Sequence, residues 1–410
     1  MMKTLRLFFC GLAVSLLVSG CGATDALRLI YGNKFASHSW EGSNTTTTLQ
    51  AQRLNTHTII PVSINGQPDL RFILDTGAMA TVIFETERTR GLLSQLDEAL
   101  DVGGMGSSKN TEARFLHDTN ITLGDVTISG LTTIFISAEN NPIFHSAEVT
   151  YADGVLGYDV FTRFVTEIDN TYNTVTISEV LNRATAGYQE LPFTIESNLP
   201  YVDIEISGLN NSVTIPAMLD TGGLGSLSIG QGYSVPDSEF LYQSQISGMG
   251  GSSDVTVNRF TALKLGNYTI SDVIAGVSQE VSSEKGKNIL GTEVLNRFDM
   301  IIDYQSERVF LKPNTTFSKP DINNVFGAWM LPHIQGAYVK QVRQDSAAFH
   351  LNIKEGDVIT TVNGNVVDTA HYDALTETLA RFEAVTSFCY LRDDVTHCET
   401  ATQPSSPSAL

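Results

Sequence analysis

Residues 72–78 read Phe72-Ile73-Leu74-Asp75-Thr76-Gly77-Ala78, an apolar run followed by an Asp, a hydroxylated residue and a Gly. A second copy, Met218-Leu219-Asp220-Thr221-Gly222-Gly223, places its Asp 145 residues later. This composition is typical of a buried strand that ends in a tight turn carrying a carboxylate. Average composition gives roughly one Asp-Thr-Gly in ten chains of this length, so chance does not account for two equivalent copies.

Paired carboxylates explain why two such turns would be useful. Two carboxyl groups held close together do not both ionise, so they share one proton and their pKa values separate. The ionised group can accept a proton from an attacking water while the protonated group donates to a peptide carbonyl oxygen. A lone Asp-Thr-Gly is about as often an ordinary turn. Thr supplies a hydrogen bond that fixes the turn, and Gly lets two backbones approach closely.

These turns resemble those of the aspartic peptidases, and more closely the retroviral-type (retropepsin-like) branch than pepsin. The resemblance implies that Asp75 and Asp220 are the catalytic dyad and that the Thr side chains grip the backbone of the opposite lobe. The residues that would support the two turns are Thr76, Gly77, Thr221 and Gly222. Ala78 matches the retroviral pattern, whereas Gly223 stands where Ala, Ser or Thr is usual.

An internal duplication surrounds the two turns. Residues 56–180 and 190–313 carry the same segments in the same order, for example "ITLGDVTISGL" and "LKLGNYTISDV". Near their ends, "VLGYDVFTRF" matches "ILGTEVLNRF", with Gly157 and Gly291 134 residues apart. Repeated supersecondary units of this kind indicate two copies of one structural unit. We therefore predict a mostly β fold in which two retropepsin-like lobes form a single-chain pseudo-dimer.

The apolar-apolar-Gly segments ending at Gly157 and Gly291 predict buried strands with a closely packed Gly, each followed by a short helix over 159–164 and 293–297. By resemblance they pass behind the catalytic turns. Either one alone is also compatible with an ordinary strand-to-helix turn.

Glycine-rich tips occur in both repeats, at 103–108 and 247–253. They resemble the flaps of retroviral peptidases, which open to admit an extended peptide and close to exclude water. The residues that would contact substrate are Gly104, Met105, Gly106, Gly248, Met249 and Gly250. A plain hairpin loop is the alternative.

The N-terminus resembles a bacterial lipoprotein signal. Residues 1–20 combine two basic residues with an apolar run too short to span a bilayer, and Val18-Ser19-Gly20-Cys21 resembles a lipobox that would make Cys21 the lipidated first residue. An ordinary signal cleaved near Cys21 is the alternative. Residues 21–55 contain a Thr-rich run and little apolar periodicity, which predicts a polar tether.

Residues 325–400 resemble a PDZ domain of the bacterial type, followed by a disordered tail at 401–410. A helix is expected over 371–382, and an edge strand beginning at Ala328 is expected to be shortened by Pro332. The residues that would capture a peptide carboxy terminus are Phe326, Gly327 and Ala328. A domain kept only for packing against the lobes is the alternative.

Cys389 and Cys398 flank Asp393-Asp394 within the PDZ-like segment. If these two Asp form a two-residue hairpin turn, the cysteines lie opposite each other and a cross-strand disulfide is expected in an oxidising compartment. Two reduced cysteines are the alternative.

Composition narrows the functional class further. The formal net charge of −20 argues against nucleic-acid binding and against adhesion to anionic lipid. The eight His are scattered without a metal-binding motif, and no serine-nucleophile segment is present. We therefore expect a monomeric aspartic endopeptidase without metal or cofactor, acting on peptides or proteins and lipid-anchored in the periplasm, with outer-membrane sorting expected. Alternatives are a peptide-binding or scaffolding lipoprotein that does not cleave, and lobes that pair between chains.

Overall fold

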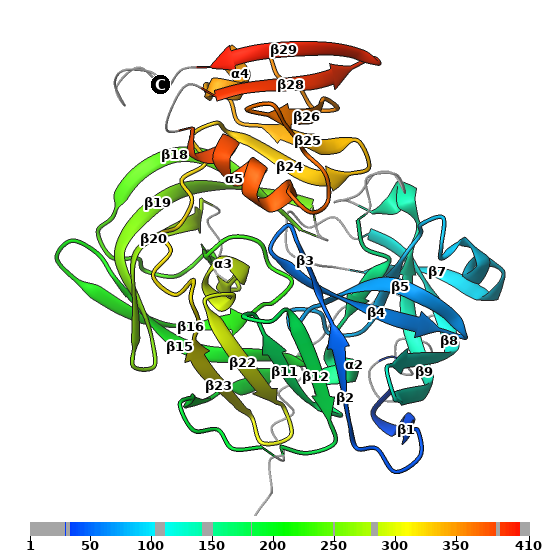
Figure 1. Ribbon diagram of the computed structural model, residues 1–410. Helices are drawn as coiled ribbons and strands as arrows, with labels where there is room; N and C mark the ends of the chain where they lie inside the picture. The colour runs from blue at the N-terminus through cyan, green and yellow to red at the C-terminus, as the bar shows by residue number, and fades with distance from the viewer. Residues whose placement is uncertain are drawn as a thin grey trace, which may run out of the picture.

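The computed structural model describes residues 29, 33–102, 111–141, 151–181, 183–248, 251–279, 286–382 and 386–401. Over these residues the protein is mostly β, as the sequence predicted. Two β lobes lie side by side, and a smaller domain sits above both of them (Figure 1). Within the described part of the chain, no helix is both long enough and apolar enough to span a membrane.

Lobe 1 is built on a nine-stranded sheet in the order β1-β9-β6-β10-β5-β4-β8-β7, with β3 paired to β4. Its strands are β1 (Ser37–Trp40), β3 (Gln52–Leu54), β4 (His57–Ile64), β5 (Gln67–Leu74), β6 (Val82–Phe84), β7 (Leu96–Val102), β8 (Thr111–Leu123), β9 (Val126–Ile136) and β10 (Gly154–Leu156). Three 3-10 turns accompany them, at Asn33–Phe35, Arg90–Gln95 and Ala138–Asn140. The central strands are buried on both faces, which explains their near-continuous apolar sequence.

Lobe 2 repeats this order, with eight strands running β14-β15-β16-β21-β17-β20-β19-β18. They are β14 (Thr194–Glu196), β15 (Leu199–Ser207), β16 (Ser212–Leu219), β17 (Leu227–Ile229), β18 (Glu239–Gly248), β19 (Gly251–Leu265), β20 (Tyr268–Ser278) and β21 (Ile289–Leu290). In each lobe a short strand runs parallel to the one that delivers the Asp: β10 beside β5 and β21 beside β16. The duplicated sequence therefore folds into two equivalent sheets.

A third sheet joins the lobes, in the order β13-β23-β22-β11-β12-β2. Its strands are β2 (Thr46–Gln50), β11 (Val165–Asp169), β12 (Thr174–Ser178), β13 (Gln189–Pro192), β22 (Phe298–Asp303) and β23 (Arg308–Pro313). Antiparallel pairing of β11 with β22 connects the first repeat to the second at the base of the molecule (Figure 1). One hydrophobic core then runs through both lobes.

The N-terminal segment corrects one prediction. Residues 33–54 are not a tether, because β1 pairs with β9, β2 with β12, and β3 with β4. On β2 the side chains of Thr47 and Leu49 are buried while those of Thr46 and Thr48 face solvent. A Thr-rich strand can bury every second side chain once a partner strand is present, and composition alone does not reveal that partner. Residues 21–28 and 30–32 lie outside the described part.

Short helices follow the two closely packed glycines. They are α2 (Tyr158–Phe161) after Gly157 and α3 (Thr292–Leu295) after Gly291, each shorter than the sequence predicted. The helices end at their C-caps, Thr162 in lobe 1 and Asn296 in lobe 2, which the predicted ranges included. Only one turn forms because the chain must leave at once for β11 or β22.

The third domain is a small α/β unit with strand order β24-β25-β26-β28-β29 and β27 paired to β26. Its elements are β24 (Ala328–His333), β25 (Gly336–Val342), α4 (Ala347–His350), β26 (Val358–Val362), β27 (Asn365–Val366), α5 (Tyr372–Arg381), β28 (Thr386–Arg392) and β29 (Val395–Ala401). Strand β24 continues through Pro332, which pairs with Ala337, so the expected shortening does not occur. Proline is tolerated there because β24 is an edge strand.

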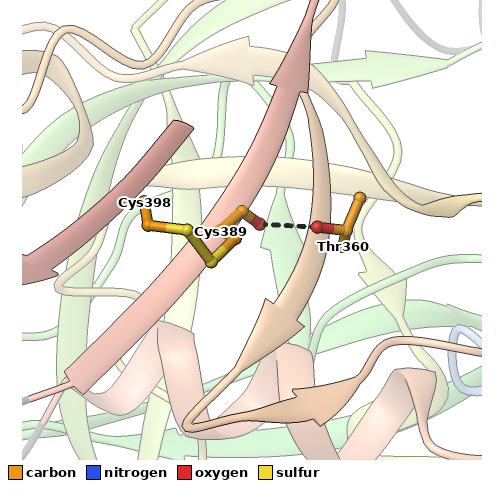
Figure 2. Close-up of a disulfide and its surroundings, with 3 residues drawn as sticks. All are labelled: Thr360, Cys389 and Cys398. Carbon is orange, nitrogen blue, oxygen red and sulfur yellow. Dashed lines mark hydrogen bonds between the residues drawn. A yellow bond between two sulfur atoms is a disulfide. The ribbon is translucent and has the colours of Figure 1, made fainter. Parts of the chain in front are cut away.

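A disulfide joins Cys389 of β28 to Cys398 of β29, at a Cα–Cα distance of 4.1 Å (Figure 2). Both Asp393 and Asp394 have positive φ, the backbone expected of a two-residue hairpin turn. The turn places the cysteines directly opposite each other. Thr360 Oγ1 also donates to the Cys389 carbonyl at 3.2 Å, which ties the bridged hairpin to β26.

Candidate active site

The two Asp-Thr-Gly turns start where parallel strands end. The Asp75 N–H donates to the Leu156 carbonyl of β10 at 3.0 Å, and the Asp220 N–H donates to the Leu290 carbonyl of β21 at 3.0 Å. Each Asp is therefore the first residue that leaves the sheet, and its side chain can project toward the other lobe. The apolar run before each Asp anchors the turn in the core.

The Thr side chains lock the two turns together. Thr76 Oγ1 donates to the Leu219 carbonyl at 2.6 Å, and Thr221 Oγ1 donates to the Leu74 carbonyl at 2.8 Å. Each Thr hydroxyl also accepts the backbone N–H of the other Thr, at 3.1 and 3.0 Å. Both side chains are buried, so these exchanged bonds hold the turns in one mutual orientation.

The glycines allow the carboxyl groups to meet. A Cβ at Gly77 would lie 2.5 Å from Asp220 Cγ, and a Cβ at Gly222 would overlap the Asp75 carboxyl group. Each Gly N–H also donates to its own Asp, at 2.8 Å to Asp75 Oδ1 and 2.9 Å to Asp220 Oδ1. The structure thus brings the carboxyl groups of Asp75 and Asp220 together across the lobe interface, within one chain.

The environment keeps one proton on this pair. Burial and the neighbouring charge of Asp220 raise the pKa of Asp75 well above its ordinary value, and burial also raises the pKa of Asp220. The hydrogen bond between the two groups favours the proton on Asp75 and the charge on Asp220. The positive charge of Lys287 acts in the same direction on Asp220. Asp75 is partly exposed, so the pair remains open to solvent on that side.

Tyr304 lies under the dyad and closes the site from below. Its hydroxyl donates to the Thr76 carbonyl at 3.5 Å, and its ring packs against Tyr158, Phe161 and Phe193 at centroid distances of 5.9, 5.6 and 5.2 Å. Burial, followed by the charges of Asp75 and Asp220, raises the pKa of Tyr304 well above its ordinary value. Tyr304 of lobe 2 is thus a buried aromatic residue packed beside the Asp75 turn of lobe 1.

The apolar-apolar-Gly segments lie directly behind the turns. A Cβ at Gly157 would lie 2.5 Å from the Ala78 carbonyl oxygen, and one at Gly291 would lie 2.7 Å from the Gly223 carbonyl oxygen. Gly223 itself is tightly placed, because a Cβ there would lie 2.9 Å from Asp220 Cγ. The second turn therefore has less room than the first, in which Ala78 occupies the same position.

Several predicted site residues are placed elsewhere or not described. The flap residue Gly248 ends β18 and pairs with Gly251, which begins β19. The lipidation candidate Cys21 and the flap residues Gly104, Met105, Gly106, Met249 and Gly250 lie outside the described residues.

The predicted carboxylate-binding loop of the third domain is largely satisfied by its own domain. The Phe326 N–H donates to the Ala380 carbonyl at 3.3 Å, and the Gly327 N–H donates to Asn324 Oδ1 at 2.8 Å. The Phe326 side chain is fully buried, and Gly327 has a φ of +80°. A peptide carboxylate at Phe326 or Gly327 would have to displace these bonds, whereas Ala328 begins the edge strand β24.

Three residues near the dyad were not predicted from the sequence: His57, Lys287 and Tyr304. His57 Nε2 lies 2.9 Å from the Gly222 carbonyl oxygen. The duplication offered one signal, because all three positions differ in the other repeat: His57 corresponds to Leu199, Lys287 to Asp153 and Tyr304 to Asn170. Among the described residues, no group of three or more His, Cys, Asp or Glu is arranged to hold a metal ion.

Comparison with known proteins agrees with the chemistry of the first lobe. A family model described as aspartyl protease matches residues 60–160, which include Asp75. The crystal structure of the aspartic proteinase from Irpex lacteus matches with 13% sequence identity and a TM-score of 0.42, over 67% of this chain and 99% of that chain. No curated protein matches the chain.

Proposed function

We propose that this protein is an aspartic endopeptidase of the retropepsin-like type, with Asp75 and Asp220 as its dyad. The observation that carries the proposal is the reciprocal locking of two Asp-Thr-Gly turns from two lobes of one chain. Such an arrangement is costly for folding, because it holds two largely desolvated carboxyl groups beside each other. Catalysis by two carboxyl groups that share one proton requires this arrangement, which accounts for the cost.

In the reaction, the two carboxyl groups have different roles. Asp220, the charged partner, accepts a proton from a water molecule as that water attacks the peptide carbonyl carbon. Asp75 donates its proton to the carbonyl oxygen, so charge does not accumulate in the tetrahedral intermediate. An extended peptide would bind between the β7–β8 and β18–β19 hairpins and the turns, largely through its main chain. No metal or cofactor is needed for these steps.

The test is peptide cleavage by a purified form lacking the signal, residues 25–410, with a peptide library from pH 4 to 8. Asp75→Asn and Asp220→Asn should each lower kcat by at least about a thousandfold, because the dyad loses its proton donor or its base. Asp203→Asn, an exposed residue of β15, is the matched control and should leave cleavage unchanged. Activity should fall as pH rises, when Asp75 loses the shared proton.

Cleavage that survives in both dyad variants would rule out this mechanism. A wild-type protein that binds peptides but never shortens them would instead favour the scaffolding lipoprotein. Light scattering on the same sample distinguishes a monomer from an obligate dimer in which lobes pair between chains.

We further propose that the protein is a lipoprotein of the bacterial cell envelope with a PDZ-like third domain. The lipobox-like sequence ending at Cys21 supports the anchor, and the order of strands and helices in the third domain supports the PDZ assignment. Fatty-acid labelling that is lost in Cys21→Ser would support lipidation, and labelling that persists would contradict it. The occupied N–H groups of Phe326 and Gly327 favour a packing role for the third domain over peptide capture.

A further inference from the structure

His57 is a buried histidine that connects lobe 1 to the catalytic turn of lobe 2. It is the first residue of β4 and is 5% exposed. Its Nε2 lies 2.9 Å from the carbonyl oxygen of Gly222, and its Nδ1 lies 2.6 Å from the hydroxyl of Tyr151. The ring also stacks on Tyr151 with an interplanar angle of 18°. Both ring nitrogens of His57 are therefore used.

The partners of His57 determine where its proton sits. A carbonyl oxygen only accepts hydrogen bonds, so Nε2 must carry the hydrogen that reaches Gly222. Nδ1 then accepts from the Tyr151 hydroxyl, whose oxygen in turn accepts from Asn55 Nδ2 at 3.3 Å. The result is a one-directional chain of hydrogen bonds from Asn55 to Gly222 in which His57 is neutral. Burial lowers the pKa of His57 to about 4, in agreement with the neutral ring.

Gly222 lies against both carboxyl groups of the dyad. Its N–H donates to Asp220 Oδ1 at 2.9 Å, and its Cα side faces the Asp75 carboxyl so closely that a Cβ would overlap it. The peptide unit that carries the Gly222 carbonyl also carries the Gly223 N–H, which hydrogen-bonds to the Asp220 carboxylate, and it begins at the Gly222 Cα that faces Asp75. A rotation of this unit would therefore change the hydrogen bonding of Asp220 and the spacing to Asp75. Holding the Gly222 carbonyl oxygen therefore holds the geometry between the two carboxyl groups.

The equivalent position in lobe 2 has no such donor. Ile59 pairs with Ile73 in lobe 1 and Tyr201 pairs with Met218 in lobe 2, which makes Leu199 the counterpart of His57. A Leu side chain cannot donate a hydrogen bond to the lobe 1 turn. The two catalytic turns are thus supported differently, and the difference falls on the turn that carries the charged Asp220.

The third domain completes the surroundings of His57. Tyr372 of α5 is 2% exposed and belongs to the same hydrophobic cluster as Tyr151. The carboxylate of Asp373 interacts with the backbone N–H groups of Asn55 and Thr56, in the hairpin just before His57. On the lobe 2 side, Thr56 Oγ1 lies 2.7 Å from Thr292 Oγ1. The hairpin is clamped between α5 and lobe 2.

We propose that His57 is a positioning residue for peptide cleavage, which holds the Gly222 peptide of the lobe 2 turn, and that the third domain helps to orient it. This inference rests on the proposed function. His57 touches no reacting atom in this scheme and acts through Gly222. Its loss should therefore lower turnover more than substrate binding, because the dyad is misaligned while the cleft remains.

The kinetic test uses His57→Phe, which keeps a ring but removes the donor, and His57→Gln, whose side-chain amide can still donate. His57→Phe should lower kcat about 10- to 100-fold with KM changed less than about twofold, and His57→Gln should recover part of the loss. His117→Phe is the matched control. It removes a hydrogen bond of 2.9 Å to Thr132 Oγ1 within lobe 1, and should leave kcat unchanged.

A second readout does not depend on activity. In amide hydrogen exchange, His57→Phe should lose protection at residues 219–224, whereas His117→Phe should keep it. Unchanged protection and unchanged kcat in His57→Phe would overturn the inference. If the wild-type protein cleaves no peptide, the proposed function fails, and the exchange measurement still decides whether His57 holds the lobe 2 turn.

Discussion

At the scale of single residues, the site contains groups whose protonation changes the stability of the fold in opposite directions. The raised pKa values of Asp75 and Asp220 mean that the folded protein binds a proton more tightly than the unfolded chain does. Their contribution to stability is thus present at low pH and is lost as pH rises above about 4. The lowered pKa of His57 has the opposite sign, because the unfolded chain binds that proton more tightly between pH 6.5 and about 4.

We predict that Asp75→Asn stabilises the protein more at pH 7 than at pH 4. The neutral amide removes the buried acid that disfavours folding at neutral pH, and removes little at pH 4, where the proton is bound in any case. Urea unfolding at the two pH values measures the difference. Asp203→Asn should show no such pH dependence, and an equal effect of Asp75→Asn at both pH values would contradict the prediction.

His57 affects the same dependence of stability on pH, on its acidic side. Its window from pH 6.5 to about 4 corresponds to about 3 kcal/mol of stability lost on acidification. Four other titratable groups lie around this site: Arg53, Tyr151, Tyr372 and Asp373. The positive charge of Arg53 lowers the pKa of His57 further. The stability of the wild-type protein is therefore expected to decline in this window more steeply than that of His57→Phe.

At the scale of elements, the sequence predicted the segments whose signal is local and repeated. The Asp-Thr-Gly turns and the strands before them stood out because apolar runs and turn residues recur in order. Strands β1 and β2 were missed because their pairing, with β9 and β12, is long-range. Strand β2 pairs with β12, which lies more than a hundred residues further along the chain, and Thr47 and Leu49 are buried on one face of the resulting sheet.

Strand β2 therefore contributes to the core, and this leads to a further prediction. Leu49→Ala should lower the free energy of unfolding by about 2–3 kcal/mol, because Leu49 is only 9% exposed within the main hydrophobic core. Thr48→Ala, an exposed neighbour on the same strand, should change it by less than about 0.5 kcal/mol. Denaturant titration distinguishes the two. Equal, small effects would restore the view of this segment as a tether.

The sequence could not have predicted the contacts of His57, Lys287 or Tyr304 with the catalytic turns. None belongs to a motif. His57 and Tyr304 reach the Asp-Thr-Gly turn of the opposite lobe only after the two lobes have come together, and Lys287 acts on Asp220 of its own lobe through its charge. Local periodicity predicts which residues form a strand. It does not predict which side chains from distant parts of the chain meet at its end.

At the scale of the whole molecule, the third domain shares its core with lobe 1. One cluster joins Ile59, Ile73 and Tyr151 of lobe 1 to Met330 and Tyr372 of the third domain. Lobe 2 is joined as well. The Arg343 guanidinium lies 3.9 Å from the ring centroid of Tyr242 on β18, and Gln341 Nε2 donates to Gln245 Oε1 at 3.3 Å. The sequence left open a domain kept for packing against the lobes, and these contacts agree with that alternative.

We therefore predict a single cooperative thermal transition for the wild-type protein in scanning calorimetry, because the shared core couples the third domain to the lobes. Tyr372→Ala should split this into two transitions by opening a cavity at the junction. Phe349→Ala is the control, since Phe349 is 48% exposed on α4. Two resolved transitions in the wild-type protein would show that the third domain unfolds independently.

The sheet that joins β11 and β12 of the first repeat to β22 and β23 of the second has a consequence for the proposed peptidase. When the halves of a site belong to separate chains, dilution pulls them apart and the site disappears. Here both halves belong to one polypeptide, so specific activity should stay constant when the enzyme is diluted to picomolar concentration. Because each half has its own coding sequence, one half can also change without the other. The corresponding positions His57 in lobe 1 and Leu199 in lobe 2 differ in this way.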